Sequence, residues 1–137
     1  MRPYHLILFL LSACTNTKGW LAIIGDDTIK VKVLIEEYEL TTGLMFHKTL
    51  DSDSGYLFLF PRPGRYPFWM KNTYIPLSIA FIDSEDRIIA IDSMIPLDTV
   101  RIFPPGLITM ALEVNQGWFK INQVKVGDQI VLKRINH

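Results

Sequence analysis

The chain has 137 residues, of which 49% are hydrophobic and 12% aromatic, and its 14 Lys and Arg residues balance 14 Asp and Glu residues. This length suits a single domain, and the apolar fraction is large enough for a folded core, which excludes a disordered composition. Affinity for nucleic-acid phosphates depends on clustered Lys and Arg, so a neutral chain without a basic block is not expected to bind DNA or RNA.

The first twenty residues, MRPYHLILFLLSACTNTKGW, have the order of an export signal: a basic Arg2, an apolar run at 6–11, and small residues before the single cysteine, Cys14. The sequence Leu-Ser-Ala-Cys ending at Cys14 resembles the cleavage box of bacterial lipoproteins. The resemblance implies cleavage before Cys14 and acylation of its thiol, so that membrane lipid becomes a partner. The alternative is a buried first strand with a core cysteine. The run is too short to span a bilayer, which takes about 20 apolar residues.

The expected organisation is a signal peptide at 1–13, a lipidated N-terminus and tether at 14–27, and a single β-domain at 28–137. The protein is then expected to be exported and anchored in a membrane. By the lipoprotein sorting pattern, Thr15 rather than Asp after the cysteine implies the periplasmic face of the outer membrane, if the host is Gram-negative.

The first elements of the β-domain follow from its alternating and aromatic stretches. Residues 28–35 predict a half-buried strand, because apolar residues alternate with two lysines. One or two helical turns are expected within 36–50, and a turn at 51–55. Residues 56–60, YLFLF, predict a short buried strand, and the proline-rich stretch 61–67 predicts a loop.

The middle of the chain predicts three further strands. Residues 68–71, FWMK, are expected to form a strand in which Trp69 and Lys71 face the same way. Two apolar runs, 77–82 and 87–92, predict a hairpin across a short polar connection.

The last third of the chain completes a mainly β pattern. The proline-rich segment 94–106 is expected to follow the surface, ahead of a strand at 107–114, a helical turn within 115–123 and a final strand within 124–135. Short strands between turn clusters predict a compact β-sandwich or barrel of about seven strands, with one or two short helical turns.

Across residues 29–133 the sequence contains, in order, GLMFHKTL, GYLFLF, PFWMKNTYIPLSIAFID, IIAID, ALEVNQGW and VKVGDQI. In this order and spacing they are similar to a bacterial family called domain of unknown function 192. The resemblance implies a single, mostly β domain that is often exported, and a family without an established reaction. Ser78 stands where the family usually has Asp, which disfavours a shared acid–base mechanism that uses that carboxylate.

Five residues are the candidate ligand-binding set: Trp69, Lys71, Asn72, Glu113 and Trp118. Trp69 is suited to stacking on a ligand and Lys71 to binding an anion, while Glu113 is a lone charge in an apolar strand. Structural alternatives stay open for each of them. Lys71 can pair with Glu113, Asn72 can satisfy backbone groups at a bend, and Trp118 can pack in the core.

No catalytic set is visible in the sequence. There is no Ser in a GxSxG elbow and no glycine loop suited to phosphates, and the lack of HExxH or paired-His spacing predicts no metal or other cofactor. The favoured interpretation is a cell-envelope binding or accessory module for a small molecule, a glycan or a partner protein. Two alternatives stay open: a hydrolase-like enzyme that uses Lys71 and Glu113 as an acid–base pair, and a purely structural envelope protein without a concave pocket.

Overall fold

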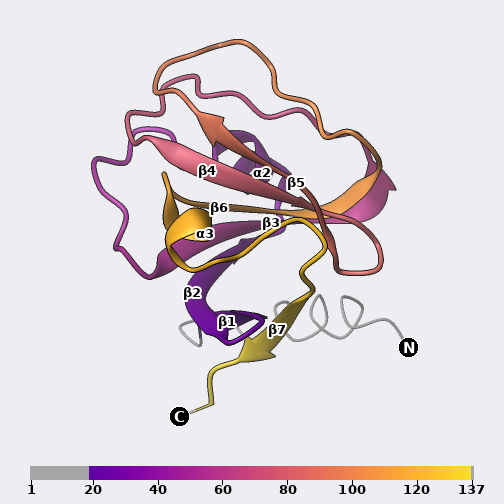
Figure 1. Ribbon diagram of the computed structural model, residues 1–137. Coiled ribbons are helices and arrows are strands. Elements are labelled where there is room, and N and C mark those ends of the chain that lie inside the picture. Colours follow the sequence, from indigo (N-terminus) through magenta and orange to yellow (C-terminus); the bar gives the residue numbers. More distant parts are fainter. Residues whose placement is uncertain (1–18, 137) are drawn as a thin grey trace.

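The computed structural model describes residues 19–136, which form seven strands and two short helices (Figure 1). In chain order these are β1 (Trp20–Ile24), β2 (Asp27–Leu34), α2 (Glu37–Thr42), β3 (Ser54–Gly64), β4 (Leu77–Ile82), β5 (Ile88–Met94), β6 (Ile108–Asn115), α3 (Trp118–Ile121) and β7 (Ile130–Arg134). The mainly β prediction is confirmed. The signal peptide and Cys14 lie outside the described residues, and within 19–136 no helix has the length and apolar character needed to cross a membrane.

All seven strands belong to one sheet, in the order β5-β4-β6-β3-β2-β1-β7. Neighbouring strands are antiparallel except for the parallel pair β2 and β3. The two ends of the sheet meet at a bridge between Arg87 and Gln129, beside which the Ile88 N–H donates to the Asp128 carbonyl oxygen at 2.9 Å. These contacts close the sheet into a small barrel.

The barrel has a core inside and a second core outside. Inside, residues from all seven strands pack with Trp118 and Phe119 of α3. Outside, β3, β4 and β6 are covered by Leu44, Phe68 and Met70, which come from the segments that cross this face. Because both faces of β4 and β6 are covered, these strands read as almost unbroken apolar runs.

The domain begins earlier than predicted, because β1 occupies a stretch that was expected to be tether. β1 pairs with β2 on one side and with β7 on the other. Gly25, with a φ of 61°, forms the tight turn between β1 and β2, a conformation that glycine adopts without steric cost. β1 and the turn that follows it therefore belong to the folded sheet, ahead of the domain start predicted at residue 28.

The strand predicted at 68–71 is wrong: this stretch is a loop with one bridge. Phe68 pairs with Ile102, and each donates its N–H to the carbonyl oxygen of the other, at 2.9 and 2.7 Å. The pairing of this stretch with Ile102 does not continue into a strand, because the chain turns at Asn72, whose φ is 54°. Phe68 and Met70 still point inward, so the predicted alternation of the side chains is retained.

The strand β3 is longer than predicted, since it continues through the proline-rich stretch to Gly64. Its register with β6 is irregular between Leu59 and Gly64. Such an irregularity tolerates prolines, which lack the N–H that a regular ladder needs. The irregular end of β3 carries the chain over the outer core and leads into the 65–76 loop.

Candidate binding pocket

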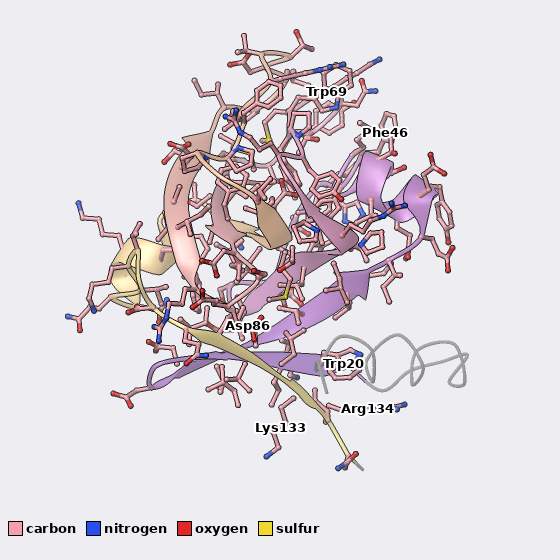
Figure 2. The ribbon with its side chains drawn as sticks, turned by 90° about the vertical axis from the view of Figure 1, so that its right-hand side faces the viewer. Trp20, Phe46, Trp69, Asp86, Lys133 and Arg134 are labelled. Carbon is pink, nitrogen blue, oxygen red and sulfur yellow. The ribbon has the colours of Figure 1, made fainter. Side chains whose placement is uncertain are left out.

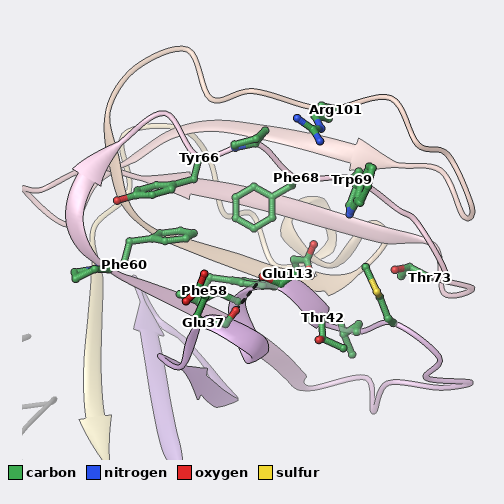
Figure 3. A pocket seen from close by; sticks show the side chains of 17 residues that line it. Glu37, Thr42, Phe58, Phe60, Tyr66, Phe68, Trp69, Thr73, Arg101 and Glu113 are labelled. Atoms are coloured by element: carbon green, nitrogen blue, oxygen red, sulfur yellow. Dashed lines mark hydrogen bonds between the residues drawn. The ribbon is translucent and has the colours of Figure 1, made fainter.

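A cavity of about 500 Å³ lies on the outer face of the barrel, between α2, the 65–76 loop and the strands β3 and β6 (Figure 3). Its size is within the range of small-molecule sites. Its walls are largely aromatic: Phe60 stacks with Tyr66 at a centroid distance of 3.9 Å, and Phe58 meets Phe68 edge to face at 5.1 Å. Trp69 adds a further ring. These rings offer flat apolar surface to a ligand.

Glu113 is the buried ionisable group among the described residues that line this cavity. It lies on β6, opposite Tyr56 of β3 and Ile79 of β4, and only 4% of its surface is exposed. Among residues 19–136, no hydrogen bond or ion pair reaches its carboxyl group. Burial raises the pKa of Glu113 from 4.5 to about 8, because the charged form loses its hydration. At neutral pH the carboxyl group is therefore mainly protonated, and it can donate as well as accept a hydrogen bond.

The end of α2 lies directly over this carboxyl group. A Cβ atom on Gly43, the residue that caps the helix, would stand 3.0 Å from Cζ of Phe58 and 3.7 Å from Oε1 of Glu113. Gly43 also has a φ of 48°, which a side chain would strain. Glycine therefore allows the close approach of α2 that forms one side of the cavity.

Two cationic side chains lie against Trp69 beside the cavity. Arg101 Cζ and Lys71 Nζ are each 5.3 Å from the centroid of the Trp69 ring, which is a cation–π distance. Arg101 lines the cavity, and Lys71 is exposed beside it. The opposite side is formed by α2, which contributes Glu37 (Figure 3).

The structural pair of Lys71 with Glu113, one of the alternatives, is not formed. In the described part of the chain, the single salt bridge within 4 Å joins Lys125 and Asp128. The structure instead brings Glu113 together with Trp69 and adds Arg101, which sequence reasoning missed. Arg101 comes from the proline-rich segment 94–106, and a basic residue between apolar neighbours was the only local signal for it.

Asn72 lies at a turn and does not line the cavity. The Phe46 N–H donates to the Asn72 carbonyl oxygen at 2.8 Å, and the Leu97 N–H donates to the Thr73 carbonyl oxygen at 3.0 Å. Phe46, Asn72 and Leu97 all have positive φ values, which are uncommon outside glycine. Three loops are thus tied together at one end of the molecule, which Figure 2 marks by Trp69 and Phe46, opposite the end with Lys133 and Arg134.

Trp118 lies away from the cavity, in the core inside the barrel. It is 6% exposed and meets Phe119 edge to face at 5.7 Å. The neighbouring Gly117 begins α3, and its N–H donates to Oγ of Ser78 at 3.0 Å. Ser78 therefore supports the start of this helix.

Potential metal ligands do not gather anywhere in the described residues: no group of three His, Cys, Asp or Glu side chains has the geometry to hold an ion. The polar groups of the described residues that line the cavity are instead two carboxyl groups, one of them buried, the Arg101 guanidinium, three threonine hydroxyls, the Tyr66 hydroxyl and the Trp69 ring N–H. Such an arrangement is suited to orienting an organic ligand through hydrogen bonds and charge.

Comparison with known proteins gives a family and a fold. Residues 21–132 match DUF192, a family described as an uncharacterized ACR. A proposed transcription regulator from Sinorhizobium meliloti 1021 has a similar crystal structure, with 28% identity, a TM-score of 0.79, and coverage of 86% of this chain and 94% of that one. A protein of unknown function from Novosphingobium aromaticivorans DSM 12444 has 28% identity, a TM-score of 0.77, and coverage of 82% and 83%. No curated protein matches the sequence.

Proposed function

The chain belongs to the domain of unknown function 192 family, and on that premise we propose that it is a binding module for a small organic ligand that occupies the cavity between α2 and the 65–76 loop. The observation that carries this proposal is Glu113, a buried carboxyl group that finds no partner within residues 19–136 and lines a cavity of about 500 Å³ with aromatic walls. A buried polar group without a partner is costly, and a bound ligand that supplies the missing hydrogen bond removes that cost.

The aromatic walls support a ligand with an apolar body. Phe58, Phe68 and Trp69 present ring surface to the cavity, and apolar contact there contributes roughly 25 cal/mol per Å² that leaves water. Glu113 then fixes the orientation of the ligand, since one polar anchor among apolar walls distinguishes ligands by their hydrogen-bonding groups.

A binding role is better supported than the two alternatives. The hydrolase-like mechanism requires Lys71 and Glu113 in one cavity, but Lys71 lies outside it on the Trp69 ring. A purely structural role predicts no concave pocket, and a cavity is present. The description of one neighbour as a transcription regulator carries little weight for this chain, because its basic and acidic residues are equal at 14 each.

A ligand-observed NMR screen of a fragment library tests the proposal, using the wild type and two variants. Thr42→Trp adds a large ring at an exposed residue that lines the cavity, whereas Thr28→Trp adds the same ring at an exposed residue of β2 outside it. Fragments are expected to bind the wild type and Thr28→Trp alike, and to bind Thr42→Trp at least about tenfold more weakly, which is ~1.4 kcal/mol. If no fragment binds, or if Thr42→Trp changes nothing, the proposal is wrong.

We propose further that this module acts in the cell envelope, anchored by lipid on Cys14. The support is the lipoprotein-type box that ends at this cysteine, the only one in the chain. Metabolic labelling with a fatty acid should label the wild type and leave Cys14→Ser unlabelled. Label that persists on Cys14→Ser, or an unlabelled wild type, would rule out the anchor.

A further inference from the structure

The cavity has opposite electrostatic character at its two ends. Glu113 supplies a buried acid within it, while Arg101, which lines it, and Lys71, which lies just outside it, place two cations around Trp69. Neither cation has a carboxylate within 4 Å among the residues that the structure describes. Figure 3 shows Arg101 and Trp69 on one side of the cavity and Glu113 farther down, toward the strands.

The buried acid favours an amine. When an ammonium group approaches the Glu113 carboxyl, the carboxyl group can lose its proton to solvent and form a buried ion pair with it. The faces of Phe58, Phe68 and Trp69 carry negative electrostatic potential, which also attracts a cation. Of the cations in the described part of the chain, those beside the cavity, Arg101 and Lys71, both lie at Trp69, so none of them would meet a ligand carboxylate at this depth.

The end of the cavity at Trp69, its mouth, favours an anion. Arg101 presents a planar fork of N–H donors, which matches a carboxylate in two-point geometry, and Lys71 adds a second positive charge. Glu37 lies across the cavity on the α2 side, away from Arg101 and Trp69, so the surroundings of Trp69 keep their positive charge. A ligand with only an amine would therefore be repelled at the mouth.

We propose that the cavity binds a small zwitterion, with its amine at Glu113, its carboxylate at Arg101 and Lys71, and an apolar segment between them along the aromatic walls. This inference rests on the proposed function and names the chemical class of its ligand. The ligand keeps its ammonium proton, and the proton that Glu113 releases goes to solvent. Binding therefore requires no other reactant.

Binding is then linked to pH through Glu113. The titratable or charged groups that face it are Glu37 on α2, Tyr56 on β3, Tyr66 on the 65–76 loop and Arg101. Since Glu113 is protonated in the free protein, affinity for an amine increases with pH, by up to about tenfold per pH unit below its pKa of about 8. The ligand amine stays charged over this range, because its ordinary pKa is about 10.4.

Isothermal titration calorimetry of the full chain with three probes tests the inference: ε-aminocaproate, n-hexylamine and hexanoate. The wild type should bind ε-aminocaproate at least about tenfold more tightly than either other probe, and more tightly at pH about 8 than at pH about 6. Glu113→Gln should weaken binding of the two amines and remove the pH dependence. Arg101→Gln should weaken binding of ε-aminocaproate and strengthen binding of n-hexylamine, because it removes one of the charges that repel an amine. Lys133→Gln removes an exposed cation at the far end and should change nothing.

The inference fails if hexanoate or n-hexylamine binds as tightly as ε-aminocaproate, if affinity is independent of pH, or if none of the three probes binds. Thermal unfolding of each variant, measured beside the titrations, separates lost binding from lost folding. The proposed function survives this failure if fragments of another class bind in a way that Thr42→Trp abolishes. The two proposals are therefore distinguishable.

Discussion

Replacing Glu113 by Gln tests the state of the buried carboxyl group without any ligand. The change keeps the size and shape of the side chain and removes its proton equilibrium. Burial gives Glu113 a pKa of about 8 in the folded protein, against 4.5 as the ordinary value. Between these values the folded chain holds a proton that the unfolded chain has lost, so the free energy of unfolding falls as the pH rises.

The size of the effect follows from the two pKa values. One pH unit corresponds to about 1.4 kcal/mol, so full ionisation of the unfolded state against a protonated folded state amounts to roughly 4 to 5 kcal/mol. Of this, roughly 3 to 4 kcal/mol falls between pH about 5 and pH about 8. Domains are typically stable by about 5–15 kcal/mol, so a fall of this size in the free energy of unfolding is a large share of the total. It should therefore be visible in a denaturation curve.

Urea unfolding of the wild type and of Glu113→Gln at the two pH values measures this difference. Glu113→Gln should gain stability relative to the wild type by roughly 3 to 4 kcal/mol on going from the lower to the higher pH, with an unchanged denaturant slope. Glu85→Gln, which removes an exposed carboxyl group at the hairpin tip, should show no such gain. A difference between Glu113→Gln and the wild type that stays constant within about 0.5 kcal/mol would refute the assignment of a buried protonated acid.

Three further predictions concern folding stability, each measured as the free energy of unfolding against the wild type. Gly55→Ala should destabilise the protein by roughly 1 to 3 kcal/mol, because the new Cβ would stand 2.9 Å from the Glu113 carbonyl oxygen; a neutral effect would mean that the strands can move apart. Ser78→Ala should cost about 1 to 3 kcal/mol, since the Gly117 N–H loses its acceptor, and a cost near zero would mean that another acceptor replaces it. Trp118→Ala should cost about 3 to 5 kcal/mol by leaving a hole in the barrel core, without a specific effect on ligand binding; loss of binding in a folded protein would contradict its position.

Local sequence patterns were sufficient to predict most of the strands. They failed for β1, which was not predicted, and for the stretch 68–71, which was predicted as a strand and is a loop. The alternation in 28–35 and the apolar runs 77–82 and 107–114 predicted β2, β4 and β6, because side-chain period and burial determine each other in a sheet. β1 was missed because the segment before residue 28 was assigned to a tether, although its apolar run ends in the Gly-Asp turn of a hairpin. The stretch 68–71 has the composition of a strand, but only one of its residues finds a strand partner.

The candidate site could be predicted only in part, because some of its residues stand out in the local sequence and others meet only through the fold. Glu113 and Trp69 stand out locally, as a charge within an apolar strand and as an aromatic residue in an unusual run, and both line the cavity. Arg101 reaches Trp69 only through a loop crossing from another part of the chain, and no local pattern encodes that contact. Trp118 looked similar to Trp69 in sequence, yet it faces the barrel interior, which depends on the direction of α3 rather than on composition.

The position of the cavity follows from how the barrel is covered. Inside the barrel, seven strands supply enough apolar side chains to fill the space. On the outer face, cover comes from α2 and from loops whose path depends on Phe46 and Leu97 in left-handed backbone conformations, which are unfavourable for such side chains. Loops tied together in this way leave a space over β6, and Glu113 occupies it where an apolar side chain would give a more stable core. Three of the five described non-glycine residues with positive φ, Phe46, Asn72 and Leu97, thus lie in the loops at the end of the molecule that holds the buried acid. Such a local cost in stability is expected where a site is built for binding.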